Sequence, residues 1–100
     1  MIDLADLTAE AFSPHAGSRY RLRPRGGGEP IPLELIEVTP GVLVPGRKRQ
    51  GFSLLFRGPH RPGLPQSIYQ LEHEAMGTFE IFLVPITPDP QGALYEAVFT

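Results

Sequence analysis

The chain has 100 residues, of which 41% are apolar and 20% are charged, and its formal net charge is −2. This composition is typical of a globular protein, and the length fits a single domain spanning residues 1–100. No cysteine is present, which excludes disulfides, thiol catalysis and thiolate metal sites. The small net charge gives no general attraction to nucleic acid or to anionic lipid, so we expect neither nucleic acid nor a membrane as a partner.

The N-terminal sequence MIDLADLTAE has neither a basic n-region nor an apolar h-region, so it does not resemble a secretory signal peptide. No apolar run approaches the length of about 18 residues that suggests a membrane-spanning helix. We therefore expect a cytoplasmic protein by default. Export without a conventional signal, or delivery within an assembled particle, stays open.

A short helix is predicted within DLTAEAFSPHAG, residues 6–17. Thr8 is an acceptable N-cap, and Glu10 lies in the first turn, where a negative charge is favourable. Pro14 interrupts the helical pattern and Gly17 ends it. No other segment predicts a helix.

The rest of the chain predicts strands, because apolar and polar residues alternate in short runs that end at Gly or Pro. These runs are residues 18–24, 32–38, 52–58, 67–73, 78–85 and 93–99. A further short strand, 42–44, is a candidate within the loop 39–51. The tetrad EAMG predicts a tight hairpin turn with Gly77 in the left-handed region.

No connection between these strands is long enough for the crossover that parallel pairing needs. The prediction is therefore a mainly β protein, a small antiparallel barrel or sandwich of about six strands with one short N-terminal helix. For the first hairpin we predict a register with Leu22 opposite Leu33 and Arg21 opposite Glu34, because it pairs apolar with apolar and opposite charges with each other.

Strands 52–58 and 78–85 are apolar on both faces, whereas a sheet with one solvated face would be polar on that face. Leu55, Phe82 and Val84 lie on the second face, which therefore needs a cover. A second subunit or a protein partner is one candidate, and these three residues would then be its contacts. The other candidate, which we favour, is the N-terminal segment, through Ile2, Leu4, Leu7 and Phe12.

The sequence contains no catalytic or metal-binding signature. His15, His60 and His73 have no spacing that places two imidazoles on one face of an element, and no serine lies in a nucleophile elbow. Glu80 alternates with apolar residues, but we expect it to face outward and pair with an arginine. We therefore predict a protein that is not an enzyme and that holds no cofactor and no metal.

An alternative is a small-ligand-binding or enzymatic β-barrel whose mouth is lined from the loops. The polar residues placed at strand ends for such a pocket are Arg57, His60, Tyr69 and His73.

Arg57 has a second interpretation, since it ends the apolar strand 52–58 just before the chain turns. Its side chain is predicted to clamp the proline-rich connector 59–66 by pairing with a carboxylate such as Glu72 or Glu96. Contact with a ligand is the other interpretation of this residue.

Three arginines, Arg19, Arg21 and Arg23, form a ridge on one face of strand 18–24 and could attract an anionic polymer. No aromatic residue alternates with them on that face. Glu34 and Glu37 are expected on the neighbouring strand, where they would neutralise part of the ridge. A solvated and cross-paired face is therefore the favoured interpretation.

Four segments together resemble an uncharacterised bacterial domain family of unknown function: LTAEAFSPHAGSRYRL, FSLLFRGP, LPQSIYQLEHEAMGTFEIFLVPI and YEAVF. The resemblance covers residues 7–99. It implies genes encoded near phage-tail collar-like proteins, and hence an accessory or structural role in a phage-tail-like or surface-fibre assembly. It implies no catalytic residues. We therefore predict a non-enzymatic interaction or assembly module, with a protein partner or a second copy as the binding partner.

Overall fold

A computed structural model describes residues 7–41, 45–46 and 50–99. The chain forms the short helix α1 (Ala9–Phe12) and then a 3₁₀ turn, η2 (Ser13–His15). The Thr8 side chain accepts a backbone hydrogen bond as the N-cap of α1, and Gly17 follows η2 with a φ of 86°. The predicted helix, its cap and its glycine end are confirmed.

Six strands follow, one for each predicted run, because the alternation of apolar residues matches the period of a strand. Five of them contain the whole predicted run, and the first is one residue shorter at each end. They are β1 (Arg19–Arg23), β2 (Ile31–Pro40), β3 (Phe52–Gly58), β4 (Ser67–His73), β5 (Gly77–Asp89) and β6 (Gly92–Phe99). Gly77 has a φ of 85°, as predicted for the β4–β5 turn. The candidate strand 42–44 lies outside the described residues.

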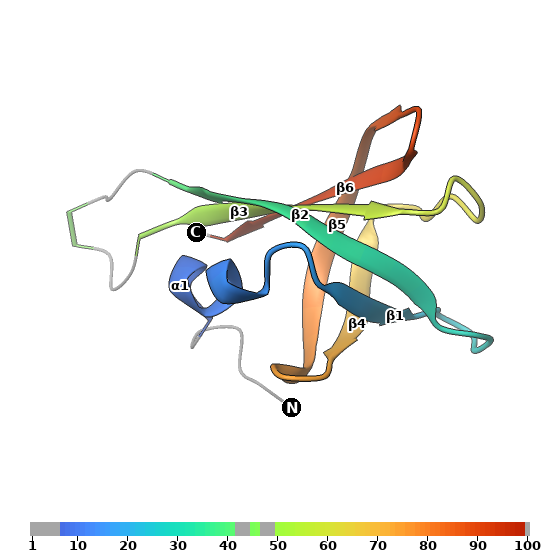
Figure 1. Cartoon of the computed structure of the whole chain (residues 1–100), viewed down its shortest axis with the longest axis horizontal. Helices are drawn as coiled ribbons and strands as arrows, with labels where there is room; N and C mark the ends of the chain where they lie inside the picture. The colour runs from blue at the N-terminus through green and yellow to red at the C-terminus, as the bar shows by residue number, and fades with distance from the viewer. Residues whose placement is uncertain (1–6, 42–44, 47–49, 100) are drawn as a thin grey trace.

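The strands close into an antiparallel barrel in the order β1-β2-β3-β6-β5-β4, with β4 paired to β1. Two three-stranded meanders, β1-β2-β3 and β4-β5-β6, are joined along β3–β6 and β1–β4 (Figure 1). The mainly β fold with one short helix is confirmed, and the closed barrel is the form that it takes. Among the six described strands, closure leaves no open sheet edge for pairing with another chain.

The barrel interior is filled by side chains. Alternate residues of every strand point inward, as in β3, where Phe52, Leu54 and Phe56 are buried. The buried apolar residues are Leu7, Phe12, Tyr20, Leu22, Ile31, Leu33, Leu35, Phe52, Leu54, Phe56, Tyr69, Leu71, Phe79, Ile81, Leu83, Tyr95, Ala97 and Phe99.

The predicted register of β1 and β2 is wrong by two residues. Glu34 faces Arg19 rather than Arg21, and Leu33 faces Tyr20. A shift by two preserves which residues point inward, so the predicted faces are correct. A pattern with a period of two cannot distinguish registers that differ by an even number.

The register is instead fixed at the end of the turn that precedes β1. The Gly17 amide donates a hydrogen bond to the Leu35 carbonyl at 2.7 Å, and the Leu35 amide donates to the Ser18 carbonyl at 3.1 Å. These bonds attach the segment after η2 to the middle of β2.

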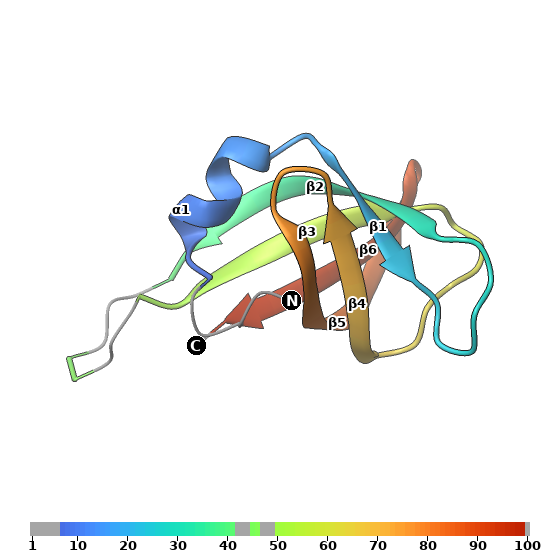
Figure 2. The same cartoon turned by 90° about the horizontal axis from the view of Figure 1, so that it is seen from below.

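Phe12 and Leu7 belong to the core of the barrel. The Phe12 ring lies 6.0 Å from Phe52, 5.7 Å from Phe79 and 6.0 Å from Phe99, measured between ring centroids. Figure 2 shows α1 lying over one end of the barrel beside β2. The N-terminal segment therefore fills the interior at this end.

This placement corrects the prediction that the N-terminal segment covers the second apolar face. Leu7 and Phe12 point into the barrel, where aromatic and aliphatic groups surround them, and not onto its outer surface. Ile2 and Leu4, the other two residues of that prediction, lie outside the described residues.

At the other end of the barrel, β3 and β6 approach each other closely. A Cβ atom on Gly92 would overlap the Gly58 carbonyl oxygen, and a Cβ atom on Gly58 would lie 2.7 Å from the side chain of Leu33. Glycine at position 92 is therefore a requirement of this close approach, because the obstructing atom belongs to the backbone, whereas at position 58 the Leu33 side chain would have to shift.

Candidate functional site

The outer face of β3, β4, β5 and β6 carries a set of large apolar side chains. Ile68 on β4 faces Phe82 on β5, and both are exposed, at 53% and 46%. Ile86 and Val98 are exposed at 39% and 65%. We call the following seven residues the outer apolar strip: Leu55, Ile68, Phe82, Val84, Ile86, Leu94 and Val98. Exposed apolar groups gathered in this way are typical of interaction sites.

The three partner contacts predicted from the sequence, Leu55, Phe82 and Val84, all belong to this strip. Phe82 is exposed, and Leu55 and Val84 are half-buried. The sequence reasoning missed Ile68, Ile86, Leu94 and Val98. Ile68, Leu94 and Val98 could have been found, because each is apolar at an outward position of an alternating strand, whereas Ile86 lies beyond the predicted strand 78–85.

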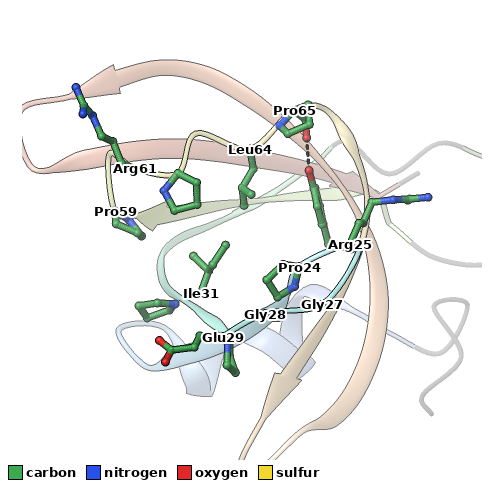
Figure 3. Close-up of a pocket in the computed structure, with 14 residues that line it drawn as sticks. Pro24, Arg25, Gly27, Gly28, Glu29, Ile31, Pro59, Arg61, Leu64 and Pro65 are labelled. Atoms are coloured by element: carbon green, nitrogen blue, oxygen red, sulfur yellow. Dashed lines mark hydrogen bonds between the residues drawn. The ribbon is translucent and has the colours of Figure 1, made fainter.

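A cleft of about 630 Å³ opens between the loop 24–32 and the connector 59–65. Figure 3 shows its apolar walls, in which Ile31 and Leu64 stand among proline rings, and Tyr69 lines the cleft as well. The prolines are Pro24, Pro30, Pro32, Pro59, Pro62 and Pro65. The volume falls within the range of small-molecule sites.

Three of the polar side chains that line this cleft already have partners or point away from it. The Tyr69 hydroxyl donates to the Pro65 carbonyl at 2.6 Å, and Arg25 donates to the Ser67 hydroxyl at 2.9 Å. Burial, together with the neighbouring Tyr95, raises the pKa of Tyr69. Figure 3 shows the guanidinium groups of Arg25 and Arg61 extending outward from the rim. The cleft therefore offers shape and apolar surface, without the convergent polar groups that orient a substrate.

The four residues proposed for a polar pocket are not brought together. Tyr69 lines the cleft, whereas Arg57 and His60 both contact Asp89, the last residue of β5. His73 ends β4 at the hairpin that leads to β5. The sequence could not reveal this separation, because strand ends that look alike in sequence belong to different ends of the barrel.

Arg57 forms an ion pair with Asp89, whose carboxylate lies 2.7 Å from the guanidinium nitrogen. Both side chains are only partly exposed, at 25% and 30%. The Arg57 hydrogen bond holds the pKa of Asp89 below its ordinary value. His60, in the connector, lies 2.9 Å from the Asp89 carbonyl oxygen. Arg57 therefore ties β3 to the end of β5 and, through Asp89, to the connector.

The carboxylate predicted for Arg57 was Glu72 or Glu96, and the structure places Asp89 there instead. Asp89 stands in the segment TPDPQG, which the sequence identifies only as a turn. The β5–β6 hairpin brings this turn to the end of β3, and that juxtaposition depends on strand order.

A cluster of polar side chains surrounds His73, which is only 7% exposed. The His73 Nε2 atom lies 2.9 Å from the Ser18 hydroxyl, and the ring lies 4.7 Å from that of His15 and 4.4 Å from that of Tyr20. Burial raises the pKa of Tyr20 to about 12, so its phenol stays protonated. Burial and the charge of His15 lower the pKa of His73, so its imidazole is neutral near pH 7.

The Ser18–His73 pair has the spacing of a nucleophile and its base, but the hydrogen bond between them runs from the histidine to the serine, opposite to the direction that catalysis needs. His73 Nδ1 accepts hydrogen bonds from the backbone amides of Ala75 and Met76, so the proton of the neutral ring is on Nε2. Nε2 therefore donates to Ser18, and the Ser18 hydroxyl donates to the His15 carbonyl at 2.5 Å. A base must instead accept the serine proton, so this arrangement holds the β4–β5 turn in place and does not activate the serine.

The arginine ridge lies on the outside of the barrel, and its counter-charge comes from β4. Arg23 forms two hydrogen bonds to the Glu72 carboxylate, both at 3.1 Å, and Arg21 lies 3.5 Å from the same group. The predicted cross-pairing is present, but the partner is Glu72 and not Glu34 or Glu37. These arginines lower the pKa of Glu72.

Among the described residues, no group of three or more His, Cys, Asp or Glu side chains is arranged to hold a metal ion. No helix in the described part of the chain is long and apolar enough to cross a membrane.

The fold and its surface define a class of protein: a small closed antiparallel barrel that presents an outer apolar strip and a proline-lined cleft. The chain belongs to the family described as Domain of unknown function (DUF6916), whose model matches residues 7–99. No curated protein and no solved structure matches the chain. The resemblance to a domain family of unknown function is thus confirmed, and the bacterial origin and phage-tail neighbourhood stay predictions.

Proposed function

We propose that this protein is a non-enzymatic interaction or assembly module that binds a protein partner through the outer apolar strip. The observation that carries the proposal is the exposure of four large apolar side chains, Ile68, Phe82, Ile86 and Val98, on neighbouring strands of one barrel. Scattered apolar residues on a surface need no explanation, but a group on one face favours an interface.

Two further features support a binding role over catalysis. The hydrogen bonds of the Ser18–His73 pair have the wrong sense for a nucleophile, and the cleft lacks convergent polar groups. A phage-tail-like or surface-fibre assembly is the context that we propose for the module, as an accessory or structural component. That context rests on the sequence resemblance.

The test is light scattering of the purified chain, alone and mixed with the products of its neighbouring genes. The proposal expects a complex with one of them, or a defined oligomer, that is lost in Phe82→Ser. Thr78→Ser, a substitution on the outer face of β5 away from the strip, is the matched control and should leave the complex intact. A chain that stays monomeric and captures no neighbour would contradict the proposal.

A second candidate function is the binding of a small ligand in the cleft, which its volume of about 630 Å³ favours. A thermal-shift screen of apolar small molecules tests this candidate. Stabilisation that disappears in Leu64→Arg, which fills the cleft with a charge, would support it. Stabilisation by no compound, or equal stabilisation of the variant, would argue against it.

A further inference from the structure

The outer apolar strip contains one carboxylate near its centre. Glu96 on β6 faces Leu55 on β3 at one side and Val84 on β5 at the other. Leu55 in turn faces Glu37 on β2, so the row across the four strands reads Glu37, Leu55, Glu96, Val84. Glu80 lies on the outer face of β5, two residues before Phe82. Three carboxylates therefore lie within or beside the strip. Two cations lie at its edges: Arg57 faces Leu94 and is paired with Asp89, and Arg25 donates a hydrogen bond to the Ile68 carbonyl.

Two other acidic groups of the barrel wall are neutralised by arginines. Glu72 is paired with Arg21 and Arg23, and Asp89 is paired with Arg57. Within the part of the chain that the structure describes, neither Glu37 nor Glu96 forms an ion pair. Glu37 and Glu96 therefore leave unneutralised negative charge at the strip, whereas Glu72 on β4 and Asp89 at the end of β5 are neutralised by arginines.

This charge distribution favours some binding partners of the strip over others. Two copies that pack their strips together by a two-fold axis would bring two sets of carboxylates into one desolvated interface, which like charges oppose. Anionic lipid would be repelled for the same reason. A protein segment that combines apolar side chains with arginine or lysine would bury the strip and neutralise its carboxylates at once.

We propose that the partner of the strip is a basic, apolar segment of another protein, whose cationic side chains pair with Glu96 and Glu37. This inference rests on the proposed function and adds the chemistry of the partner. Within the complex, the apolar residues around Glu96 exclude water and strengthen its pairing, while the apolar contacts provide most of the affinity.

The test uses three synthetic peptides of equal length and the intact, isotope-labelled protein. The first alternates leucine with arginine, the second alternates leucine with glutamate, and the third alternates serine with arginine. Titrations followed by amide chemical shifts report both affinity and the residues contacted. We expect the leucine–arginine peptide to bind most tightly and to shift the amides of Phe82, Val84 and Glu96.

Single substitutions assign the binding to the proposed charges. Glu96→Gln should weaken the leucine–arginine peptide roughly two- to fivefold, the effect of one modest ion pair. Glu10→Gln, on α1, changes the net charge equally and should leave the affinity unchanged. Phe82→Ser should abolish binding of the same peptide.

Four results would each contradict the proposal that the partner is a basic, apolar segment. The first is equal binding of the leucine–glutamate peptide at the strip, which would leave the interaction function standing. The second is binding of the serine–arginine peptide as tight as that of the leucine–arginine peptide. The third is the absence of shifts at the strip with all three peptides, and the fourth is self-association or vesicle binding through Phe82. The interaction function itself is judged separately, by the light-scattering test with neighbouring gene products.

Discussion

Replacing Phe12 by alanine should destabilise the protein far more than the same change at Phe82. The Phe12 side chain is 0% exposed and contacts the rings of Phe52, Phe79 and Phe99, whereas Phe82 keeps 46% of its surface in water. Removal of a fully buried phenylalanine costs about 3–5 kcal/mol, because transfer energy is lost and a cavity remains. About half of the Phe82 surface is buried, which makes its loss worth about 1 kcal/mol.

The expected difference between the two variants is therefore about 2–4 kcal/mol in the free energy of unfolding. For a domain of this size it corresponds to about 8–30 °C in Tm. Urea denaturation followed by circular dichroism measures both variants under one condition. Phe12→Leu, which keeps most of the apolar volume, should fold and lose less than about 1.5 kcal/mol if Phe12→Ala does not fold.

Equal losses for Phe12→Ala and Phe82→Ala would refute the assignment of Phe12 to the interior and Phe82 to the exterior. It would mean that the N-terminal segment does not fill the barrel end. The same result would remove the basis for treating the strip as an uncovered surface.

Three other changes test the remaining features. Gly92→Ala should lower the free energy of unfolding by about 1–3 kcal/mol, because its Cβ would overlap a backbone oxygen of β3. Gly63→Ala has open space around its Cβ and should be close to neutral. Similar urea midpoints for the two variants would contradict the close approach of β3 and β6. Burial and His15 lower the pKa of His73 from 6.5, so the unfolded chain takes up the proton first and the free energy of unfolding should fall as the pH drops below that value. Denaturation at a series of pH values should show a flatter profile for His73→Phe, and an unchanged profile would exclude His73 as the cause. Arg57→Ala should lower Tm at neutral pH, because it removes the ion pair with Asp89. The difference in Tm from the unsubstituted protein should shrink only below pH 3.8, because the pKa of Asp89 is lowered and its carboxylate stays charged down to that range. Unchanged stability together with lost ligand or partner binding would favour a binding role for Arg57.

The strands could be predicted because each is a local property of the sequence. Alternation in β1, β3 and β4 defines both the element and its inward face, and Gly77 marks the β4–β5 turn through its left-handed backbone. Thr8 and Gly17 similarly marked the ends of the helical segment. None of these features depends on which strands become neighbours.

The candidate surface was predicted in part, for the same reason. Leu55, Phe82 and Val84 are apolar, although the alternation of their strands places them on the outer face. This conflict is visible in the sequence. The prediction that the N-terminal segment covers this outer face was wrong. From the sequence, a helix that carries Leu7 and Phe12 could either lie over an outer face or fill the barrel interior. Only the space between β3, β5 and β6, which Phe12 fills beside Phe52, Phe79 and Phe99, decides between them.

The sequence alone therefore determined the strands, their faces, the short helix and the presence of more apolar surface than one core needs. The tertiary structure decided the register of β1 with β2, the pairing of Arg57 with Asp89 and the cluster of His15, Ser18 and His73. It also placed Glu96 among apolar neighbours from two other strands. Alternation acts over a few neighbouring residues, whereas these contacts join segments far apart in the chain and exist only once the barrel closes in one strand order.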